Sequence, residues 1–304
     1  MVVALCAFSV VPARVMAQGD GPHNLPLIPI STNIFTPQML VLSGNFNPAG
    51  NAFIPFANVD ALVFPLTLIR TFALGSRFGR LFVVVPVGSI DASATAVDPR
   101  TGETVTVSRG AYGFMDPIVV LHIGLVGAPA LKPAAYMQHP KSFTMLAILG
   151  ASPPLGEYDD NRLINLGTNR WTFRTGIGMV FPFGEKKRTA LEMANSLYFF
   201  TTNNDVILTA GQRTQDPLYV LENHLTHNFT PKLWASLDVR WQYGGETTTD
   251  GVPDDNLTNI LGGGASLGYQ FTPHFGAWTS FGRVWAGLDN AKQNMVRLQF
   301  AVSY

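Results

Sequence analysis

The sequence predicts an all-β protein, a transmembrane antiparallel β-barrel of about twelve strands, and three observations lead to this fold class. Charged residues make up 13% of the 304 residues, about half the share found in an ordinary soluble protein. The mean hydropathy is high, at +0.18, yet the chain has no run of ~18 apolar residues that would span a membrane as a helix. Segments in which apolar and polar residues alternate fill the chain instead, and this period of two indicates strands.

The segment at 233–243 shows the alternation most clearly. Leu237 and Val239 fall on one face of the strand, and Asp238 and Arg240 on the other, because successive side chains point to opposite sides. The polar face of such segments is rich in Gly, Ser and Thr with scattered charges, whereas a soluble β-sandwich would carry a charged outer face. We therefore expect the apolar face to meet lipid and the polar face to line a lumen.

Twelve segments of this kind follow one another, and most have ~10–14 residues, against the ~9–11 that a tilted strand needs to cross a bilayer. We predict strands near 38–47, 59–70, 79–91, 115–126, 142–152, 170–182, 188–201, 217–229, 232–244, 257–271, 275–286 and 293–304. The connections near 71–78, 183–187, 230–231 and 272–274 are tight, and those near 92–114, 153–169, 202–216 and 245–256 are longer and polar. Short turns at one end and long loops at the other are typical of outer-membrane barrels. The connection at 127–141 is longer than a tight turn and is compatible with a short helix or an amphipathic flap.

Both ends of the chain carry features of export. Residues 1–17 are predicted to be a signal peptide, with an apolar core and a cleavage point after Ala17. Cys6, the one cysteine, lies within it, so the mature chain would offer no thiol for a disulfide, a nucleophile or a zinc site. The terminal Tyr304, after alternating apolar residues, resembles the assembly signal of bacterial outer-membrane barrels. We expect the bacterial outer membrane as the location, with its lipid and, through Tyr304, the assembly machinery as partners.

Residues 18–37 form a Pro-rich segment without a strand pattern, ahead of a barrel domain at 38–304. Proline cannot donate to a β-ladder, so we do not expect this segment to join the sheet as a central strand. Its Leu and Ile residues are too apolar for a soluble tail, which leaves two places: the lumen, as a plug, or the periplasmic rim. Twelve strands at ~4.8 Å spacing and ~40° tilt give a backbone radius of roughly 12 Å and a pore of about 10 Å, wide enough for one extended chain.

The charged members of the polar face are the candidate lumen-lining residues. They are Arg170, Arg174, Glu192, Glu222, His224, Asp238, Arg240 and Arg297. Inside a barrel such charges must pair or meet water. Their signs are mixed, so we expect no strong ion selectivity, and they either brace the lumen or contact solutes. The net charge of zero argues against a nucleic-acid partner, which would favour a basic excess.

No catalytic, cofactor or metal site is predicted. The G-x-S-x-G pattern at 264–268 lies within a strand, whereas a hydrolase nucleophile needs a strand–turn–helix elbow. His224 and His227 are three apart, which places them on opposite faces of a strand and prevents joint chelation. Clustered carboxylates in loops could bind Ca²⁺, but solvated loop charges are the default interpretation. The acids concerned are Asp159, Asp160, Asp250, Asp254 and Asp255.

Several strings carry a family resemblance. The most specific are NLGTNRW at 165–171 and QDPLY at 215–219, and weaker ones are GAPAL at 127–131, PLGEYD at 154–159 and GGETTTDG at 244–251. Together they resemble the bacterial transporter family named for the MetA pathway of phenol degradation, over about residues 35–304. GFMDP at 113–117 departs from the usual Gly-x-Gly-Asp-Pro, which affects the local loop shape. The resemblance implies an outer-membrane barrel that passes aromatic or other small compounds, and it carries over no site residues.

The predicted function is therefore an outer-membrane channel for small apolar or aromatic solutes. Two other classes are alternatives: a barrel enzyme with hydrolase chemistry, and a structural or adhesive barrel. The enzyme would need a serine, a histidine and an acid together on one face near a rim. The adhesin would favour much longer exposed loops than those of this chain.

Overall fold

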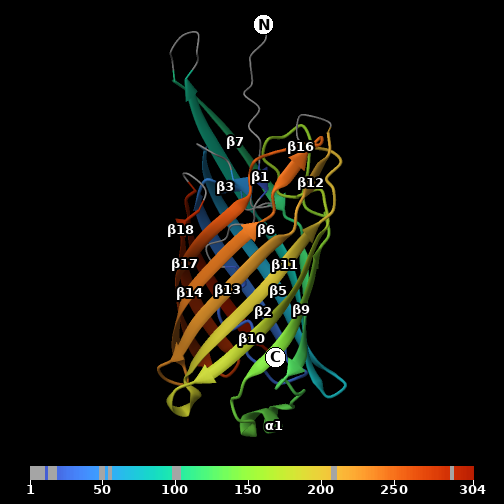
Figure 1. The fold of residues 1–304 in the computed structure, drawn as a ribbon. Helices are drawn as coiled ribbons and strands as arrows, with labels where there is room; N and C mark the ends of the chain where they lie inside the picture. Colours follow the sequence, from blue (N-terminus) through green and yellow to red (C-terminus); the bar gives the residue numbers. More distant parts are fainter. Residues whose placement is uncertain are drawn as a thin grey trace.

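The computed structural model describes residues 11–12, 19–47, 52–53, 57–97, 104–206, 211–287 and 291–304. Its main element is an antiparallel sheet that closes on itself into a barrel (Figure 1). The strands are β2 (Asn33–Gly44), β5 (Ala57–Leu74), β6 (Arg77–Val97), β7 (Thr104–Phe114), β8 (Ile118–Val126), β9 (Thr144–Ser152), β10 (Thr172–Phe183), β11 (Thr189–Phe200), β13 (Leu218–Asn228), β14 (Leu233–Gly244), β17 (Thr258–Thr272), β18 (Phe275–Ala286) and β19 (Gln293–Ser303). The ring closes at β2, which pairs with both β19 and β5.

Twelve strand positions make up the described wall, because β7 and β8 share one side of β6. Strand β8 pairs with β6 from Gly79 to Val84, and β7 pairs with it from Val87 to Val97. The structure confirms the predicted twelve-stranded antiparallel barrel. Closure gives each of the twelve strand positions a neighbour on both sides, which removes most of the edges that would otherwise invite pairing with other chains, whereas β7 pairs with β6 alone.

The first strand of the wall begins at Asn33 rather than at residue 38, and it includes Pro37. The ladder with β19 breaks at this proline, since Gln38 pairs with Gln299 and the next pair is Phe35 with Val302. Proline has no N–H to donate, so it is tolerated where the ladder is interrupted. The expectation that the prolines keep this part of the chain out of the sheet is therefore wrong for residues 33–37.

Strands β6 and β7 extend into the region 92–114, which the sequence predicts to be a loop. They pair from Val87 opposite Phe114 to Val97 opposite Thr104, and the hairpin rises above the rest of the wall (Figure 1). Small residues such as Ala92, Ser93 and Ala94 alternate too weakly in hydropathy to mark this extension as a strand.

The two ends of the barrel differ in their connections, as predicted. One end carries tight turns, the short helix α1 (Pro133–Gln138) within the 127–141 connection and the single turn η1 (Glu185–Lys187). The other end carries the longer connections, with two small sheets of β1 (Val11–Pro12), β3 (Phe46–Asn47) and β4 (Ala52–Phe53), and of β12 (Arg213–Gln215), β15 (Thr247–Thr249) and β16 (Val252–Pro253). The short-turn end is the one that faces the periplasm in outer-membrane barrels. Among the described helices, none is long and apolar enough to cross a membrane.

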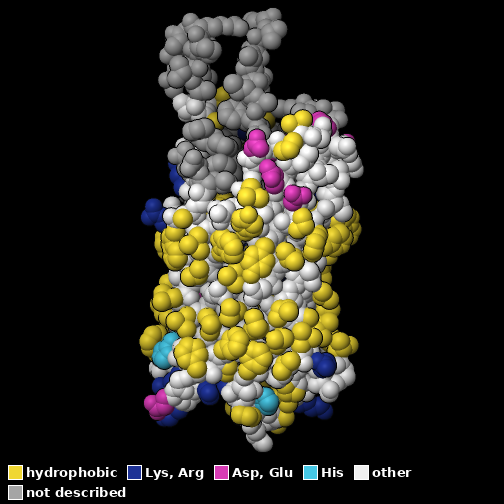
Figure 2. Space-filling view, in the orientation of Figure 1, with side chains coloured by type: hydrophobic (Ala, Val, Ile, Leu, Met, Phe, Trp, Pro, Cys, Tyr) yellow, Lys and Arg dark blue, Asp and Glu magenta, His cyan; other side chains and the backbone are white. Residues whose placement is uncertain are grey.

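The outer face of the wall is apolar. On β14, Leu237 is 64% exposed whereas its neighbour Asp238 is 1% exposed, which confirms the faces predicted from the alternation. Figure 2 shows hydrophobic side chains spread over the wall, with Lys and Arg above and below this band, mostly at the lower end. An exposed apolar band of this extent is the surface that lipid covers in an outer-membrane barrel.

The segment 19–32 lies inside the barrel. Leu25 is buried against inward-facing residues that include Phe82, Leu146 and Ile148. Further along, the Ser31 N–H donates to the Thr71 carbonyl at 3.0 Å, and the chain then enters β2. Residues 1–17, for which we predict a signal peptide, lie outside the described residues apart from β1.

Candidate lumen site

The inner face of the barrel has two unlike sides. The apolar side consists of β2, β5, β6, β8 and β9, where most of the inward residues are aliphatic or aromatic. Its buried members include Leu40, Leu42, Val63, Phe82, Ile90, Val120, Leu146 and Ile148. The charged side consists of β10, β11, β13, β14, β17, β18 and β19, where the inward residues are mostly polar. Its buried members include Glu192, Ser196, Glu222, His224, Asp238, Arg240, Ser266, Ser280 and Arg297.

Seven of the eight candidate lumen residues lie on the inner face of the charged side. These are Arg174 on β10, Glu192 on β11, Glu222 and His224 on β13, Asp238 and Arg240 on β14, and Arg297 on β19. The eighth, Arg170, precedes β10. Its guanidinium lies 4.5 Å above the centre of the Phe200 ring and donates to Gln215, so it belongs to the loop end rather than to the central lumen.

A hydrogen-bonded cluster centres on Asp238. His224 Nδ1 lies 2.6 Å from Asp238 Oδ1, and His224 Nε2 lies 2.9 Å from Glu222 Oε1. Ser236 and Ser266 each donate to Asp238 at 2.9 Å. Both ring nitrogens of His224 therefore face carboxylates, and Ser266 bonds the acid rather than the imidazole. This geometry gives the serine no base to take its proton, so the G-x-S-x-G serine is not arranged as a hydrolase nucleophile.

The segment 19–32 is bound to the charged side by its backbone. The Gly21 N–H donates to Glu222 Oε1 at 2.8 Å, and the His23 N–H donates to Glu192 Oε2 at 3.0 Å. Arg297 Nη2 donates to the Gly19 carbonyl at 2.7 Å. Carboxylates and guanidinium groups thus satisfy peptide groups that have no partner in the sheet, which is how a non-strand segment can lie in a buried lumen.

Arg80 and His122 belong to the lumen site although the sequence analysis did not select them. Arg80 Nη1 donates to the Pro26 carbonyl at 3.2 Å, and its Nη2 lies 3.2 Å from His122 Nδ1. The guanidinium also lies 5.1 Å from the centre of the Phe82 ring, on the otherwise apolar side. The alternation of Phe78, Arg80 and Phe82 on one face was the signal present in the sequence. The role of Arg80 could not be inferred from this pattern, because it depends on the segment 19–32 lying in the lumen beside β6.

The α1 connection holds the periplasmic end of the segment. The Tyr136 hydroxyl donates to the Leu27 carbonyl at 2.9 Å, and the Ile30 N–H donates to the Leu131 carbonyl at 2.8 Å. Burial raises the pKa of the Tyr136 hydroxyl, which keeps this donor protonated at neutral pH. The long connection at 127–141 therefore binds the N-terminal segment through these two hydrogen bonds.

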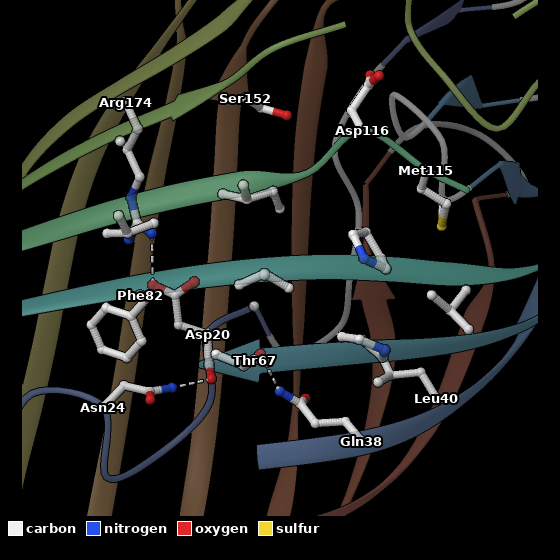
Figure 3. Close-up of a pocket in the computed structure, with 18 of the residues that line it drawn as sticks. Asp20, Asn24, Gln38, Leu40, Thr67, Phe82, Met115, Asp116, Ser152 and Arg174 are labelled. Carbon is white, nitrogen blue, oxygen red and sulfur yellow. Dashed lines mark hydrogen bonds and ion pairs between the residues drawn. The ribbon is translucent and has the colours of Figure 1, made fainter. Parts of the chain in front are cut away.

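A cavity of about 270 Å³ lies between the segment 19–32 and the apolar side. Its apolar lining includes Leu40, Leu42, Val63, Phe82, Val120 and Met115. Its charged lining includes Arg240 and Arg297. Figure 3 shows three further charged residues of the lining, Asp20, Arg174 and Asp116, of which Asp116 accepts hydrogen bonds from Gly156 and Thr168. The cavity is thus apolar along one wall and charged at one end.

Four of the five acidic loop residues have partners within the loops, and Asp160 accepts a hydrogen bond from the Asn161 side chain at 2.7 Å. Asp159 pairs with Arg162 at 3.1 Å, and the Asn161 N–H bonds to it, which lowers the pKa of Asp159. Asp250 accepts the Gln212 N–H at 2.8 Å, and Asp254 lies 3.7 Å from Arg213. Among the described residues, no group of three or more His, Cys, Asp and Glu side chains could hold a metal ion.

Comparison with known proteins agrees with this architecture. A model of the family described as "Putative MetA-pathway of phenol degradation" matches residues 44–294, which confirms the resemblance carried by 165–171 and 215–219. The COG4313 outer membrane channel from Pseudomonas putida F1 is similar with a TM-score of 0.77 and 18% identity, covering 93% of this chain and 99% of that chain. A Pseudomonas aeruginosa FadL homologue is similar with a TM-score of 0.40 and 10% identity, covering 90% and 89%. No curated protein matches the chain. The likeness to the COG4313 channel shows that the fold is that of a bacterial outer-membrane barrel.

Proposed function

Because the chain belongs to the phenol-degradation MetA-pathway family, we propose that it is an outer-membrane channel for small apolar or aromatic compounds. The observation that carries this proposal is the apolar wall of the lumen cavity. An apolar cavity of about 150 Å³ holds benzene, so a cavity of about 270 Å³ accommodates a substituted ring. The COG4313 protein with the same fold is itself described as a channel.

The lining of the cavity favours apolar over hydrophilic solutes. A general porin has a polar, water-filled lumen, whereas the inward residues Leu40, Leu42 and Val63 present aliphatic groups to the cavity. An apolar solute gains about 25 cal/mol for each Å² that it removes from water against such a wall. A sugar would lose hydrogen bonds to water against these aliphatic groups without replacement.

In this proposal the segment 19–32 is a plug that must shift for a solute to pass. It fills the lumen beside the cavity, held by Glu222 and Glu192 on the charged side and by the packing of Leu25 on the apolar side. Its contacts are single hydrogen bonds, the ion pair of Asp20 with Arg174 and the packing of a few apolar side chains around Leu25, rather than a continuous ladder. Such a segment can leave the lumen while every strand of the described wall stays paired.

The proposal is tested by deleting residues 19–32 while keeping β2 intact from Asn33. Single-channel recordings in planar bilayers should show a several-fold higher conductance for the truncated chain than for the full chain. Proteoliposomes with the full chain should admit toluene vapour or phenol faster than empty liposomes, and should admit glucose no faster. Equal conductance of the two forms contradicts the plug, and equal uptake of phenol with and without protein contradicts the channel for aromatic compounds.

The family membership and the fold point to a channel rather than to an enzyme. The enzyme alternative receives no support from the serine at 266, since its hydroxyl bonds Asp238 and Ser280. We propose that the chain acts without catalysis and that its selectivity comes from the two sides of the lumen.

A further inference from the structure

Three arginines surround the charged end of the cavity, and one of them holds an acid of the N-terminal segment. Arg174 Nη1 donates to Asp20 Oδ2 at 2.7 Å (Figure 3). Arg297 bonds the neighbouring Gly19 carbonyl at 2.7 Å, and Arg240 lies 4.0 Å from Glu222. Arg174 is thus the arginine of the cavity whose carboxylate partner comes from the segment 19–32 rather than from the barrel wall.

The ion pair between Arg174 and Asp20 is asymmetric. The Arg174 side chain is 9% exposed and is fixed by a second bond from Nε to Ser196 at 3.0 Å and by the Tyr198 ring, whose centre is 5.5 Å away. The Asp20 side chain is 43% exposed and belongs to a segment without a ladder. A buried, oriented guanidinium therefore meets a more exposed carboxylate, which a solute carboxylate can replace by rotation of the Asp20 side chain while the Asp20 N–H stays bonded to Glu222 Oε2 at 3.2 Å.

An apolar platform leads along the wall to this arginine. Phe82 on β6 pairs with Val120 on β8, Val120 with Gly150 on β9, and Gly150 with Arg174 on β10. All four residues line the cavity. A Cβ atom on Gly150 would lie 3.2 Å from the Cβ of Arg174, so the glycine keeps a further side chain out of the space between Val120 and the stem of Arg174. The row offers a ring-sized apolar surface with a cation at its end.

We propose that Arg174 forms a carboxylate subsite, occupied in this structure by Asp20, and that its ligand is a small aromatic monocarboxylate of the benzoate type. The ligand's carboxylate replaces that of Asp20 on Arg174, where a guanidinium can bind both carboxylate oxygens. Its ring lies over Gly150 against Val120 and Phe82. The proposal rests on the proposed function, because it names the solute class that the same cavity selects.

The charge of the lining supports an anionic ligand. With Asp20 displaced, the described lining of the cavity contains Arg174, Arg240 and Arg297 against one acid, Asp116, which is engaged by Gly156 and Thr168. A free inorganic anion would gain the same attraction to the arginines but would leave the apolar row uncovered. A neutral arene would cover the row but could not compete with Asp20. The aromatic monocarboxylate satisfies both parts of the site.

Displacement of Asp20 also links binding to the plug. Asp20 and the ligand carboxylate cannot occupy Arg174 together, so ligand binding breaks one of the contacts that hold residues 19–32. Because the two carboxylates exclude each other, weakening the Asp20 contact strengthens ligand binding, by at most the factor by which that contact is weakened. The direction of this change in ligand affinity distinguishes a ligand subsite from an ion pair that only stabilises the fold.

The test is isothermal titration calorimetry of the refolded full chain in detergent, with benzoate and with its neutral isostere benzamide. Asp20→Asn, which lies outside the barrel wall, should bind benzoate several-fold more tightly than the wild type and should bind benzamide unchanged. Arg174→Gln should weaken benzoate about tenfold or more, as expected for the loss of a charged hydrogen-bond donor, and should spare benzamide. Arg170→Gln, a buried arginine outside the cavity, is the matched control and should change neither affinity.

Benzoate affinity that is equal in the wild type and Asp20→Asn, or equal in Arg174→Gln and Arg170→Gln, overturns the carboxylate subsite. Binding of benzamide together with uptake of phenol in proteoliposomes would then leave the proposed channel standing. If Arg174→Gln fails to give a heat-modifiable folded band, Asp20→Asn alone decides, since the subsite requires its tighter binding of benzoate. Failure of phenol uptake, with charge-selective benzoate binding retained, overturns the channel and keeps the subsite.

Discussion

The two sides of the lumen solve the same burial problem with different chemistry. On the apolar side, residues such as Leu40, Val63 and Ile90 are buried by close packing, which needs no particular partner. On the charged side, Glu222, His224 and Asp238 are buried only because each carries a specific hydrogen bond. The difference shows that one barrel can present an apolar surface for solutes on one side and, on the other, a hydrogen-bonded set of polar side chains that binds its plug. The four predictions that follow test this division, beginning at the seam where the two sides meet.

Deleting Tyr304 is expected to lower the amount of folded protein in the outer membrane several-fold, the largest of the four effects. Tyr304 closes the seam between β19 on the charged side and β2 on the apolar side. Its N–H donates to the Asn33 carbonyl at 2.9 Å and its carbonyl accepts the Asn33 N–H at 3.1 Å. The terminal aromatic is also the residue that we predict the assembly machinery to recognise. The folded, heat-modifiable band in purified outer membranes measures the effect.

The matched control for this deletion is Tyr304→Phe, which keeps the aromatic ring and both backbone bonds. Its level should equal that of the wild type. A deletion variant that reaches wild-type levels would show that neither the seam bonds nor the terminal aromatic matters for assembly.

Asp238→Ala is expected to destabilise the folded barrel by about 3–5 kcal/mol, because it leaves a buried partner uncompensated. His224, Ser236 and Ser266 would all lose their acceptor. The free energy of unfolding, from a urea titration in detergent micelles, measures the loss. Ser280→Ala is the control at the edge of the same cluster, and it should cost only about 1 kcal/mol. Equal losses of unfolding free energy for the two variants would mean that Asp238 is not the centre of the hydrogen-bonded cluster.

Val239→Arg is expected to cost about 2–4 kcal/mol, since the change places a cation against the middle of the bilayer. Val239 is the outward neighbour of Asp238 and Arg240 on β14. The test separates the lipid face from the lumen face of one strand, and urea titration in lipid bilayers measures it. Val252→Arg, in the exposed strand β16, should leave stability unchanged. If Val239→Arg is tolerated equally well, this part of β14 does not face lipid.

Ile90→Val is expected to give the smallest effect, about 0.5–1.5 kcal/mol, because it removes one methylene from a packed apolar site. Ile90 is fully buried, lies opposite Ala61 on β5 and belongs to the same apolar cluster as Leu42 and Val59. The same urea titration in detergent measures it, with the exposed Val107→Ala as a control that should change little. If Ile90→Val lowers the free energy of unfolding as much as Asp238→Ala does, the two sides do not differ in how they are stabilised. The apolar side would then depend on individual contacts as strongly as the charged side depends on its hydrogen bonds.

Most of the fold could be predicted from the sequence because the signal is local. The alternation in 233–243 predicts both the strand β14 and its two faces, and the structure has Leu237 outside and Asp238 inside. The same argument selected Glu222 and His224 for the lumen. It could not identify Asp238 as the partner of His224, because that contact depends on the register between β13 and β14.

Other features required the tertiary structure for reasons that are also physical. The role of Arg80 depends on peptide carbonyls of the segment 19–32, more than fifty residues away in the chain. The extension of β6 and β7 consists of small residues whose hydropathy barely alternates. The entry of Pro37 into β2 depends on where the ladder with β19 breaks.

By itself, the sequence determined the fold class, the family, the approximate positions of most strands and the two faces of those that alternate clearly, such as β14. The strands and their faces follow from an alternation with a period of two residues, and the family follows from short sequence motifs. Neither kind of signal requires knowledge of distant contacts. Only the closed barrel decided that the lumen has an apolar and a charged side, that the segment 19–32 lies between them, and that Asp20 reaches Arg174. Those facts depend on which strands become neighbours around a ring and on what fills its interior, and no local pattern encodes a contact between residues 20 and 174.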